Sequence, residues 1–327
     1  MTAEVNSDIP TLGLVSGITT RFQQLIVKPV YNESRSFNSA NAILVPHDAY
    51  DFVNNKEYTK YLAGLSKHKM LIIFDTGDFP QKIKIPNSVA LRVAINPGES
   101  MKNKVVIPYN VMSLNFLPLR KYDLKPSACF VGHLPNIFAP RRLLKSLKQN
   151  PFNPIIGNGS LVRKIAVTNC LARVDDFVLI KRNSPNTAVR NQQLRIVERD
   201  EYINTISEID IGLAPRGDAN QSLRFYELLS AGRIPMIPNS KMIYPKIIYN
   251  DEIQNLLISF NLFNDTSKVI DTYWQKIGNN KNYERIQNQI RMFFDNHLQY
   301  NIFMRKLFEL NYTDFLKLSN FTQGKNE

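Results

Sequence analysis

Cysteine, histidine and tryptophan are scarce in this chain of 327 residues, which contains two Cys, four His and one Trp. Two cysteines exclude a disulfide framework and a zinc site built from several cysteines. The four histidines are dispersed, so local spacing assembles no cluster of metal ligands. We therefore expect no metal and no bound cofactor.

Long apolar runs are also absent, since no stretch reaches the ~18 residues that a membrane span needs. The first twenty residues lack the basic segment followed by an apolar segment that is typical of a signal peptide. The low cysteine content fits a reducing compartment. These absences predict a protein without a membrane span and with a cytoplasmic location.

Acidic residues are outnumbered, with 28 Asp and Glu against 41 Lys and Arg, which gives a net charge of +13. This excess favours phosphate-bearing ligands, anionic glycans, nucleic acid or an anionic membrane surface, but it does not indicate a fold. The hydrophobic fraction of 43% is ordinary for a globular protein. At roughly 150 residues per domain, the length predicts two domains.

Short apolar runs that end in Pro, Gly or Asp recur along the chain, with helical stretches between them. Unbroken aliphatic runs of this length suit strands that are buried on both faces of a parallel sheet. We predict strands at residues 41–46, 70–75, 89–95, 105–108, 128–132, 177–180, 194–197, 209–214 and 234–238. We predict helices at residues 58–67, 141–148, 222–231, 283–294 and 300–318.

Residues 117–126 interrupt this alternation with charged, proline-punctuated sequence, which is typical of a linker. The alternation then restarts and ends in helices from about residue 265. We therefore predict an α/β protein with two parallel-sheet domains in series, at residues 1–121 and 122–327, the second including the C-terminal closing helices.

The most informative segment is residues 209–239, where a buried strand is followed by Pro215-Arg216-Gly217, a helix and a second buried strand. In an open α/β sheet, ligands bind at the carboxyl ends of strands, where helix N-termini attract anions. Arg216 offers a fork that matches phosphate oxygens, and Gly217 permits close approach of the backbone. Ser222, at the expected helix start, is placed to cap the helix or to contact a phosphate.

Arg224 and Glu227 lie three residues apart on one face of the expected helix. A cation and an acid beside a phosphate loop fit a nucleoside diphosphate, with Arg for the charge and Glu for two ribose hydroxyls. The plainer alternative is that the two residues form an ordinary surface pair and that Ser222 is only a cap.

This segment resembles the exostosin family of glycosyltransferases, whose motif is a Pro-Arg-Gly loop, then Ser-x-Arg-x-x-Glu, a Gly and an Ile-Pro strand. Further similarities include FDTGDFP at residues 74–80, where Asp75 takes the family's Asp position, and ACFVGH at residues 128–133 followed by Arg141 and Arg142. Phe74 and Thr76 depart from the family's His and Trp. The chain looks like a soluble bacterial or viral relative.

The resemblance implies a GT-B-like architecture, in which two Rossmann-like domains face a central cleft, with the acceptor side first and the nucleotide-sugar side second. It implies an inverting, metal-independent hexosyl or pentosyl transfer from a UDP-sugar to an oligosaccharide or other glycan acceptor. Without a metal, arginines must supply the positive charge that the diphosphate leaving group needs. The donor-binding residues would then be Arg216, Gly217, Ser222, Arg224, Glu227, Gly132 and Arg141.

An inverting transfer also needs a base on the opposite face of the sugar, which we expect from the first domain. Asp75 and Asp78 follow a buried strand, and His47 follows another and titrates nearer neutrality. The two aspartates could instead shape the turn at DTGD. We favour Asp75 or Asp78 as the catalytic base, with His47 third.

Two other functions remain open on the sequence. The charge of +13 allows a nucleic-acid-binding protein, but the basic residues are scattered and form no recognised motif, so no nucleic-acid partner is expected. A catalytically dead, glycan-binding relative is the other, although such a protein need not keep Arg216, Arg224 and Glu227. His133 and residues 157–160 (GNGS) are better explained as structural, because GNGS lacks the ending of a phosphate-binding P-loop.

Overall fold

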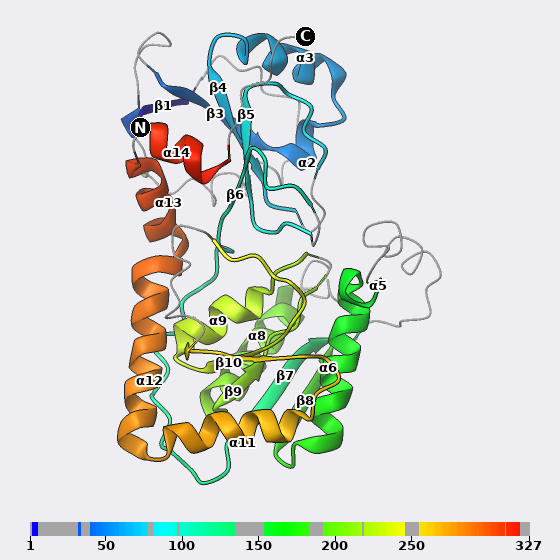
Figure 1. The fold of residues 1–327 in the computed structure, drawn as a ribbon, viewed down its shortest axis with the longest axis vertical. Helices are drawn as coiled ribbons and strands as arrows, with labels where there is room; N and C mark the ends of the chain where they lie inside the picture. The colour runs from blue at the N-terminus through cyan, green and yellow to red at the C-terminus, as the bar shows by residue number, and fades with distance from the viewer. Residues whose placement is uncertain are drawn as a thin grey trace.

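The chain forms two α/β domains, one above the other in the computed structural model (Figure 1). The structure describes residues 2–5, 32–33, 40–77, 81–96, 99–134, 154–182, 192–217, 219–245, 255–310 and 312–320. The expected helix at residues 141–148 lies outside these ranges, as do the site candidates Asp78 and Arg141. Each domain is built on one parallel sheet. The predicted α/β class, with two Rossmann-like domains built on parallel sheets, is therefore confirmed.

The first sheet has six strands in the order β2-β1-β3-β4-β5-β6. They are β1 (Thr2–Val5), β2 (Asn32–Glu33), β3 (Ala42–Asp48), β4 (Met70–Asp75), β5 (Ser88–Arg92) and β6 (Lys104–Val106). Helices α2 (Ala49–Phe52) and α3 (Lys56–Leu65) connect β3 to β4. The pairing of β3 with β4 shifts register between Leu44 and Asp48, the stretch that contains Pro46, whose backbone has no N–H to donate.

The second sheet has five strands in the order β11-β10-β9-β7-β8. They are β7 (Ala128–His133), β8 (Phe177–Arg182), β9 (Ile211–Leu213), β10 (Ile234–Pro238) and β11 (Ile258–Phe260). Its helices are α5 (Pro154–Gly157), α6 (Gly159–Arg173), α8 (Gln192–Glu208), α9 (Leu223–Ala231) and α11 (Thr266–Ile277). The predicted strands at 128–132, 177–180, 209–214 and 234–238 and the helix at 222–231 are confirmed within a few residues.

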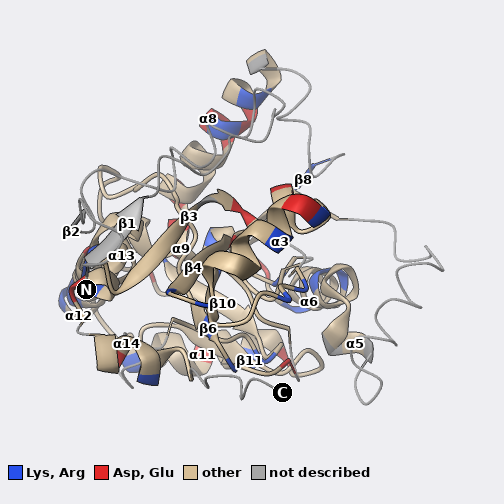
Figure 2. Cartoon of the chain, turned by 90° about the horizontal axis from the view of Figure 1, so that it is seen from above, with Lys and Arg blue, Asp and Glu red and all other residues tan. Residues whose placement is uncertain are grey.

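The predicted strand at residues 194–197 is wrong, because these residues belong to α8. Leu194, Ile196 and Val197 are 39%, 49% and 56% exposed, so the apolar run does not mark a buried strand. The side chains that α8 buries are Tyr202 and Ile206, one helical turn apart. A four-residue apolar run fits a helix as well as a strand, and here the surrounding Gln, Arg and Glu favour helix. Figure 2 shows α8 extending away from the body of the molecule.

The C-terminal helices join the two domains along one side (Figure 1). They are α12 (Asn280–Phe293), a π-helical turn (Phe294–Leu298), α13 (Tyr300–Glu309) and α14 (Tyr312–Leu318). The backbone N–H of Lys104 in β6 donates to the carbonyl of Ser319 at 3.1 Å. The end of the described chain therefore pairs with the edge strand of the first sheet.

The predicted linker is held firmly against the second domain. Arg120 and Gln287 exchange two hydrogen bonds of 2.8 and 2.9 Å between the linker backbone and the Gln287 side chain. The ring of Tyr122 stacks on Trp274 with centroids 5.2 Å apart, and the indole N–H of Trp274 donates to the carbonyl of Asp123. These contacts fix the predicted linker to α11 and α12.

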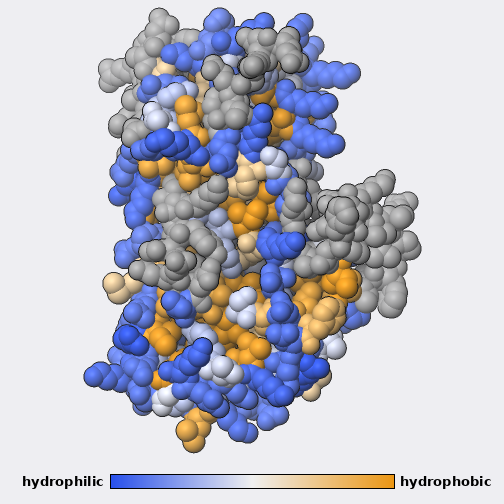
Figure 3. Space-filling view, viewed as in Figure 1, coloured by the Kyte–Doolittle hydropathy of each residue, from blue (hydrophilic) through white to orange (hydrophobic). Residues whose placement is uncertain are grey.

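The surface carries both signs of charge across many elements. Figure 2 shows Lys and Arg on several helices, among them α6 and α8, with Asp and Glu also on α8. On the face shown in Figure 3, hydrophilic residues predominate at the two ends and apolar residues show between them. None of the described helices has both the length and the apolar character needed to cross a membrane.

Candidate active site

The topology of the second sheet identifies where a ligand should bind. In the order β11-β10-β9-β7-β8, the chain leaves β7 toward β8 and then returns to β9 on the other side of β7. The carboxyl ends of β7 and β9 therefore flank a topological switch point. Parallel α/β sheets bind their ligands in the crevice at such a point. The Pro-Arg-Gly loop follows β9, so the sequence motif and the topology select the same place.

The loop after β9 brings Arg216, Gly217 and Ser222 to this point. Arg216 is only 2% exposed, and its Nε lies 3.4 Å from the carbonyl oxygen of Gly217. Ser222 is the N-cap residue of α9, with φ −125° and ψ 123°, yet its hydroxyl makes no capping hydrogen bond. The cap alternative for the Ser222 side chain is therefore not realised, although the residue occupies the cap position.

Arg224 and Gly132 contact each other across the switch point. The Nε of Arg224 donates to the carbonyl of Val131, and its guanidinium lies over the ring of Phe130, 5.4 Å from the centroid. A Cβ at Gly132 would lie 2.5 Å from Nη2 of Arg224. Any side chain at Gly132 would therefore have to displace the guanidinium of Arg224 from its observed position.

Glu227 faces α8 rather than β7. It is 4% exposed, and its Oε1 forms an ion pair with Nη1 of Arg199 on α8. Arg199 in turn lies over the ring of Tyr202, 5.2 Å from the centroid. The alternative that Arg224 and Glu227 form an ordinary surface pair is wrong, because Glu227 is buried and the partner of its Oε1 is Arg199.

Sequence reasoning missed two arginines near this site, Arg199 and Arg163. Arg199 lies two residues after the apolar run at residues 194–197, in the same helix, α8, whose contact with α9 the sequence does not show. Arg163 lies in α6, where its Nη1 donates to the carbonyl of His133 at 2.9 Å. The local signal for Arg163 was the GNGS stretch, in which Asn158 caps α6 by accepting from the N–H of Leu161.

His133 takes a structural part at the end of β7. Its Nδ1 lies 3.1 Å from the carbonyl of Arg182, the last residue of β8. The ring therefore bridges two neighbouring strand ends, which agrees with the structural interpretation of this histidine.

The first-domain candidates lie at the carboxyl ends of β3 and β4. His47 is 6% exposed, with its ring edge-on to Tyr58 at 5.6 Å between centroids. Burial lowers the pKa of His47, so its imidazole is neutral near pH 7. The neighbouring Asp48 links the two strand ends, because its Oδ2 accepts from the N–H and the hydroxyl of Thr76 at 2.9 and 2.7 Å.

Asp75 is buried in an ion pair at the end of β4. It is 1% exposed, and its Oδ2 lies 2.8 Å from Nε of Arg92 and accepts from the N–H of Gln81 at 2.9 Å. Burial raises the pKa of Asp75 to about 6, although Arg92 opposes this shift. Its other oxygen, Oδ1, has no hydrogen-bond partner among the described residues. Arg92 also pairs with Glu99, which pairs with Lys104 at 2.8 Å.

The loops at the carboxyl ends of the two sheets meet. Asn220, in the loop after β9, donates through Nδ2 to the carbonyl of Ile95 beyond β5 at 3.0 Å, and to that of Lys241 at 2.8 Å. Among the predicted donor-binding residues, Gly132 and Arg224 are in contact, and Arg216, Gly217 and Ser222 lie in the loop after β9. Asp75 and His47 lie at the carboxyl ends of β4 and β3, the end of the first sheet from which the loop with Ile95 also leaves.

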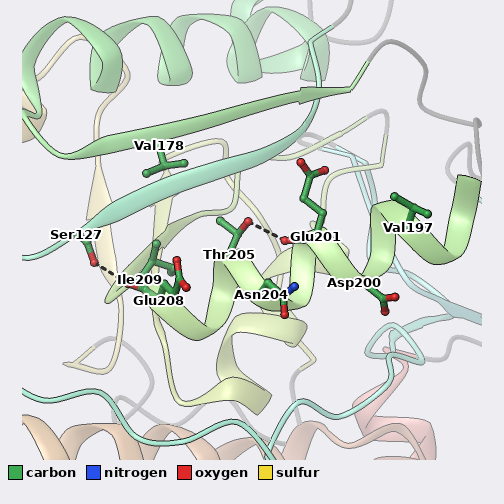
Figure 4. Close-up of a pocket in the computed structure, with 9 residues that line it drawn as sticks. All are labelled: Ser127, Val178, Val197, Asp200, Glu201, Asn204, Thr205, Glu208 and Ile209. Carbon is green, nitrogen blue, oxygen red and sulfur yellow. Dashed lines mark hydrogen bonds between the residues drawn. The ribbon is translucent and has the colours of Figure 1, made fainter.

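A pocket of about 550 Å³ lies at the opposite end of the second sheet (Figure 4). It is lined by Ser127, Val178, Val197, Asp200, Glu201, Asn204, Thr205, Glu208 and Ile209. Ser127 and Ile209 precede β7 and β9, so the pocket lies near the amino ends of these strands. Its lining includes the carboxylates of Asp200, Glu201 and Glu208, of which Glu201 pairs with Arg182, and this acidic lining disfavours a diphosphate.

Metal ligands do not gather anywhere in the described ranges, where no three His, Cys, Asp or Glu side chains could hold an ion together. Asp210 illustrates the use of carboxylates in this fold. Its oxygens accept from Ser127 and from the hydroxyl of Tyr283 at 2.8 Å, and they contact Arg120. This carboxylate fixes the linker to the second domain.

No family model matches the chain, and no curated protein matches its sequence. Among solved structures, a glycosyltransferase from Rickettsia africae ESF-5 is similar at a TM-score of 0.39 and 11% identity, over 86% of this chain and 77% of that one. The structure of TarM is similar at a TM-score of 0.37 and 11% identity, and the match covers 80% of this chain and 57% of the TarM chain. The apo form of the lipopolysaccharide outer core galactosyltransferase WaaB is similar at a TM-score of 0.37 and 14% identity. That match covers 83% of this chain and 76% of the WaaB chain.

Proposed function

We propose that this protein is a glycosyltransferase that moves a sugar from a nucleoside-diphosphate donor, a UDP-sugar, to a glycan acceptor. One observation carries the proposal: the loop that contains Arg216 and the amino end of α9, with Arg224, follow β9 at the topological switch point, where Arg224 contacts the end of β7. Guanidinium groups and helix N-termini are the groups that bind phosphate oxygens. Ser222, with its hydroxyl outside the capping hydrogen bond, adds a donor at the same place.

The residues support a metal-independent leaving-group mechanism. As the bond between the anomeric carbon and the diphosphate oxygen breaks, its electron pair leaves with the diphosphate. Arg216 and Arg224 would stabilise this charge in a site where burial strengthens electrostatic interactions. Glu227 would accept from the ribose hydroxyls, with Arg199 paired to its Oε1.

Inversion requires that the acceptor hydroxyl attack from the face opposite the diphosphate while a base removes its proton. Asp75 has the chemistry for this step, because its pKa of about 6 lies near neutrality and its Oδ1 has no described partner. His47 is neutral and is also able to accept a proton. Asp78, which the sequence favours equally with Asp75 and ahead of His47, lies outside the described residues.

Thermal denaturation with UDP, GDP, dTDP and CMP tests the donor site directly. A ligand present at about 100 times its dissociation constant should stabilise the fold by ~2.7 kcal/mol. We expect UDP to raise the melting temperature, followed by transfer from the matching UDP-sugar that persists in EDTA. If none of the four nucleotides stabilises the protein, the assignment of these residues to a donor site is wrong. Strict dependence on Mn²⁺ or Mg²⁺ would contradict the metal-independent mechanism.

A further inference from the structure

Arg163 lies between the two strand ends that define the switch point. Its Nη1 donates to the carbonyl of His133 at the end of β7. On the other side, a Cβ at Gly217 would lie 2.8 Å from Nη2 of Arg163. The guanidinium therefore touches both the end of β7 and the Pro-Arg-Gly loop that follows β9, and the missing side chain of Gly217 makes that approach possible.

Arg163 and Arg224 approach from helices on opposite faces of the second sheet. α8 and α9 pack against each other, whereas α6 packs against α11 and β8. This division follows from the sheet order, because right-handed connections place α6 on one face and α8 and α9 on the other. A ligand at the switch point would thus meet Arg224 from one face and Arg163 from the other.

The start of α6 adds a second favourable feature. Asn158 caps the helix, and Arg163 lies about one turn further along. A helix of this length presents its positive end toward the carboxyl ends of the strands. The side-chain charge of Arg163 and the dipole of α6 therefore act in the same direction.

We propose that Arg163 binds the second phosphate of the donor and so makes this site select nucleoside diphosphates over monophosphates. The inference rests on the proposed donor site and extends it to a residue outside the sequence motif. A planar guanidinium binds two phosphate oxygens at once, which a monophosphate held by Arg216 and Arg224 would not require. The carbonyl of His133 fixes one side of the guanidinium, so the group is oriented before the ligand arrives.

The test compares UDP, UMP and uridine binding by calorimetry for the wild type, Arg163→Gln and Arg173→Gln. Arg173→Gln is the matched control, because it removes the same charge from the far end of α6. There Arg173 contacts Asn169 and Asn264. We expect Arg163→Gln to weaken UDP binding on the order of 10- to 100-fold while UMP and uridine change less than about threefold. Arg173→Gln should leave all three affinities unchanged.

The outcomes separate the two proposals. If the wild type does not bind UDP, the proposed function fails, and with it the role of Arg163 in binding the second phosphate. If the wild type binds UDP and Arg163→Gln loses UDP and UMP equally, Arg163 only supports the loop and the inference is overturned.

Loss of the His133 contact could prevent Arg163→Gln from folding, which far-ultraviolet circular dichroism would reveal. Arg163→Lys then decides the question, because it keeps the charge but loses the fork. We expect its ratio of UDP to UMP affinity to fall at least about threefold. An unchanged ratio in a folded Arg163→Lys protein overturns the role of Arg163.

Discussion

Glu227 of α9 forms a buried ion pair with Arg199 of α8, 28 residues earlier in the chain. The side chain of Glu227 is 6% exposed and that of Arg199 is 30% exposed. A buried carboxylate needs a compensating charge, and Arg199 supplies it for Glu227. The pair also joins two helices on the same face of the second sheet.

Replacing Glu227 with Gln should weaken UDP binding by about 1.5–3 kcal/mol, because the ribose hydroxyls lose a charged acceptor. Calorimetric titration with UDP measures the loss. Arg199→Gln is the partner control, since it breaks the same ion pair without removing the acceptor. If Glu227 serves only the ion pair, both variants will lose stability to a similar extent and bind UDP normally.

Gly132→Ala should displace Arg224, because the added Cβ would lie 2.5 Å from Nη2 of that arginine. We expect a loss of UDP affinity similar to that of Arg224→Gln, about 1.5–3 kcal/mol for a charged hydrogen bond. The double variant should bind no more weakly than either single variant, since both remove the same contact.

Gly64→Ala is the matched control for this substitution. Gly64 lies in α3, and a Cβ there would meet nothing within 4 Å. It should leave UDP binding unchanged and stabilise the fold by up to about 1 kcal/mol, as alanine does in a helix. Normal UDP binding by Gly132→Ala would show that Arg224 does not need its observed position.

The sequence predicts the second domain well where local signals are strong. The strands around α9 are unbroken apolar runs, and Gly232 ends the helix with a φ of +69°, a conformation that favours glycine. The same reasoning fails at residues 194–197, where a short apolar run lies in a helix. It also misses β11, because the three residues of this strand carry too little pattern.

The site was predictable only as far as its residues lie together in the sequence. Arg216, Ser222 and Arg224 fall within one loop and helix, so a motif can contain them. Arg163 of α6 contacts His133 and Arg199 of α8 contacts Glu227, from opposite faces of the sheet, and only the sheet order places these helices beside β7 and α9. No spacing rule in the sequence encodes such contacts.

Asp75 should make the stability of the protein depend on pH. Burial raises the pKa of Asp75 to about 6, above its value of about 3.9 in an unfolded chain. The folded state therefore holds this proton where the unfolded state has lost it. Its contribution is fully present below about pH 4 and is lost as the pH rises through 6, by roughly 2–3 kcal/mol.

Urea denaturation at pH 4, 5, 6 and 7 measures this effect in the wild type and in Asp75→Asn. The wild type should lose stability relative to the variant across this range. Asp175→Asn serves as a surface control, because the side chain of Asp175 is 86% exposed. Parallel curves for the wild type and Asp75→Asn would contradict the raised pKa.

The catalytic base is the last prediction, and it requires the transfer assay. Asp75→Asn keeps the size of the side chain but removes the proton acceptor, so turnover should fall ~10²–10⁴-fold while UDP binding stays near normal. The wild-type kcat/KM should rise with pH through about 6, where Asp75 loses its proton, and this limb should vanish in the variant.

Asp78→Asn and His47→Gln complete the series, because both lie close to the same strand ends in the sequence. If His47 is the base, its lowered pKa should move the rise of kcat/KM with pH below the usual pKa of histidine. Only one oxygen of Asp75 is available as the base, because Arg92 pairs with Oδ2 at 2.8 Å. The hydroxyl of the sugar acceptor would have to approach Oδ1. If all three variants turn over normally, the acceptor hydroxyl loses its proton elsewhere, and the ends of β3 and β4 only support the first sheet.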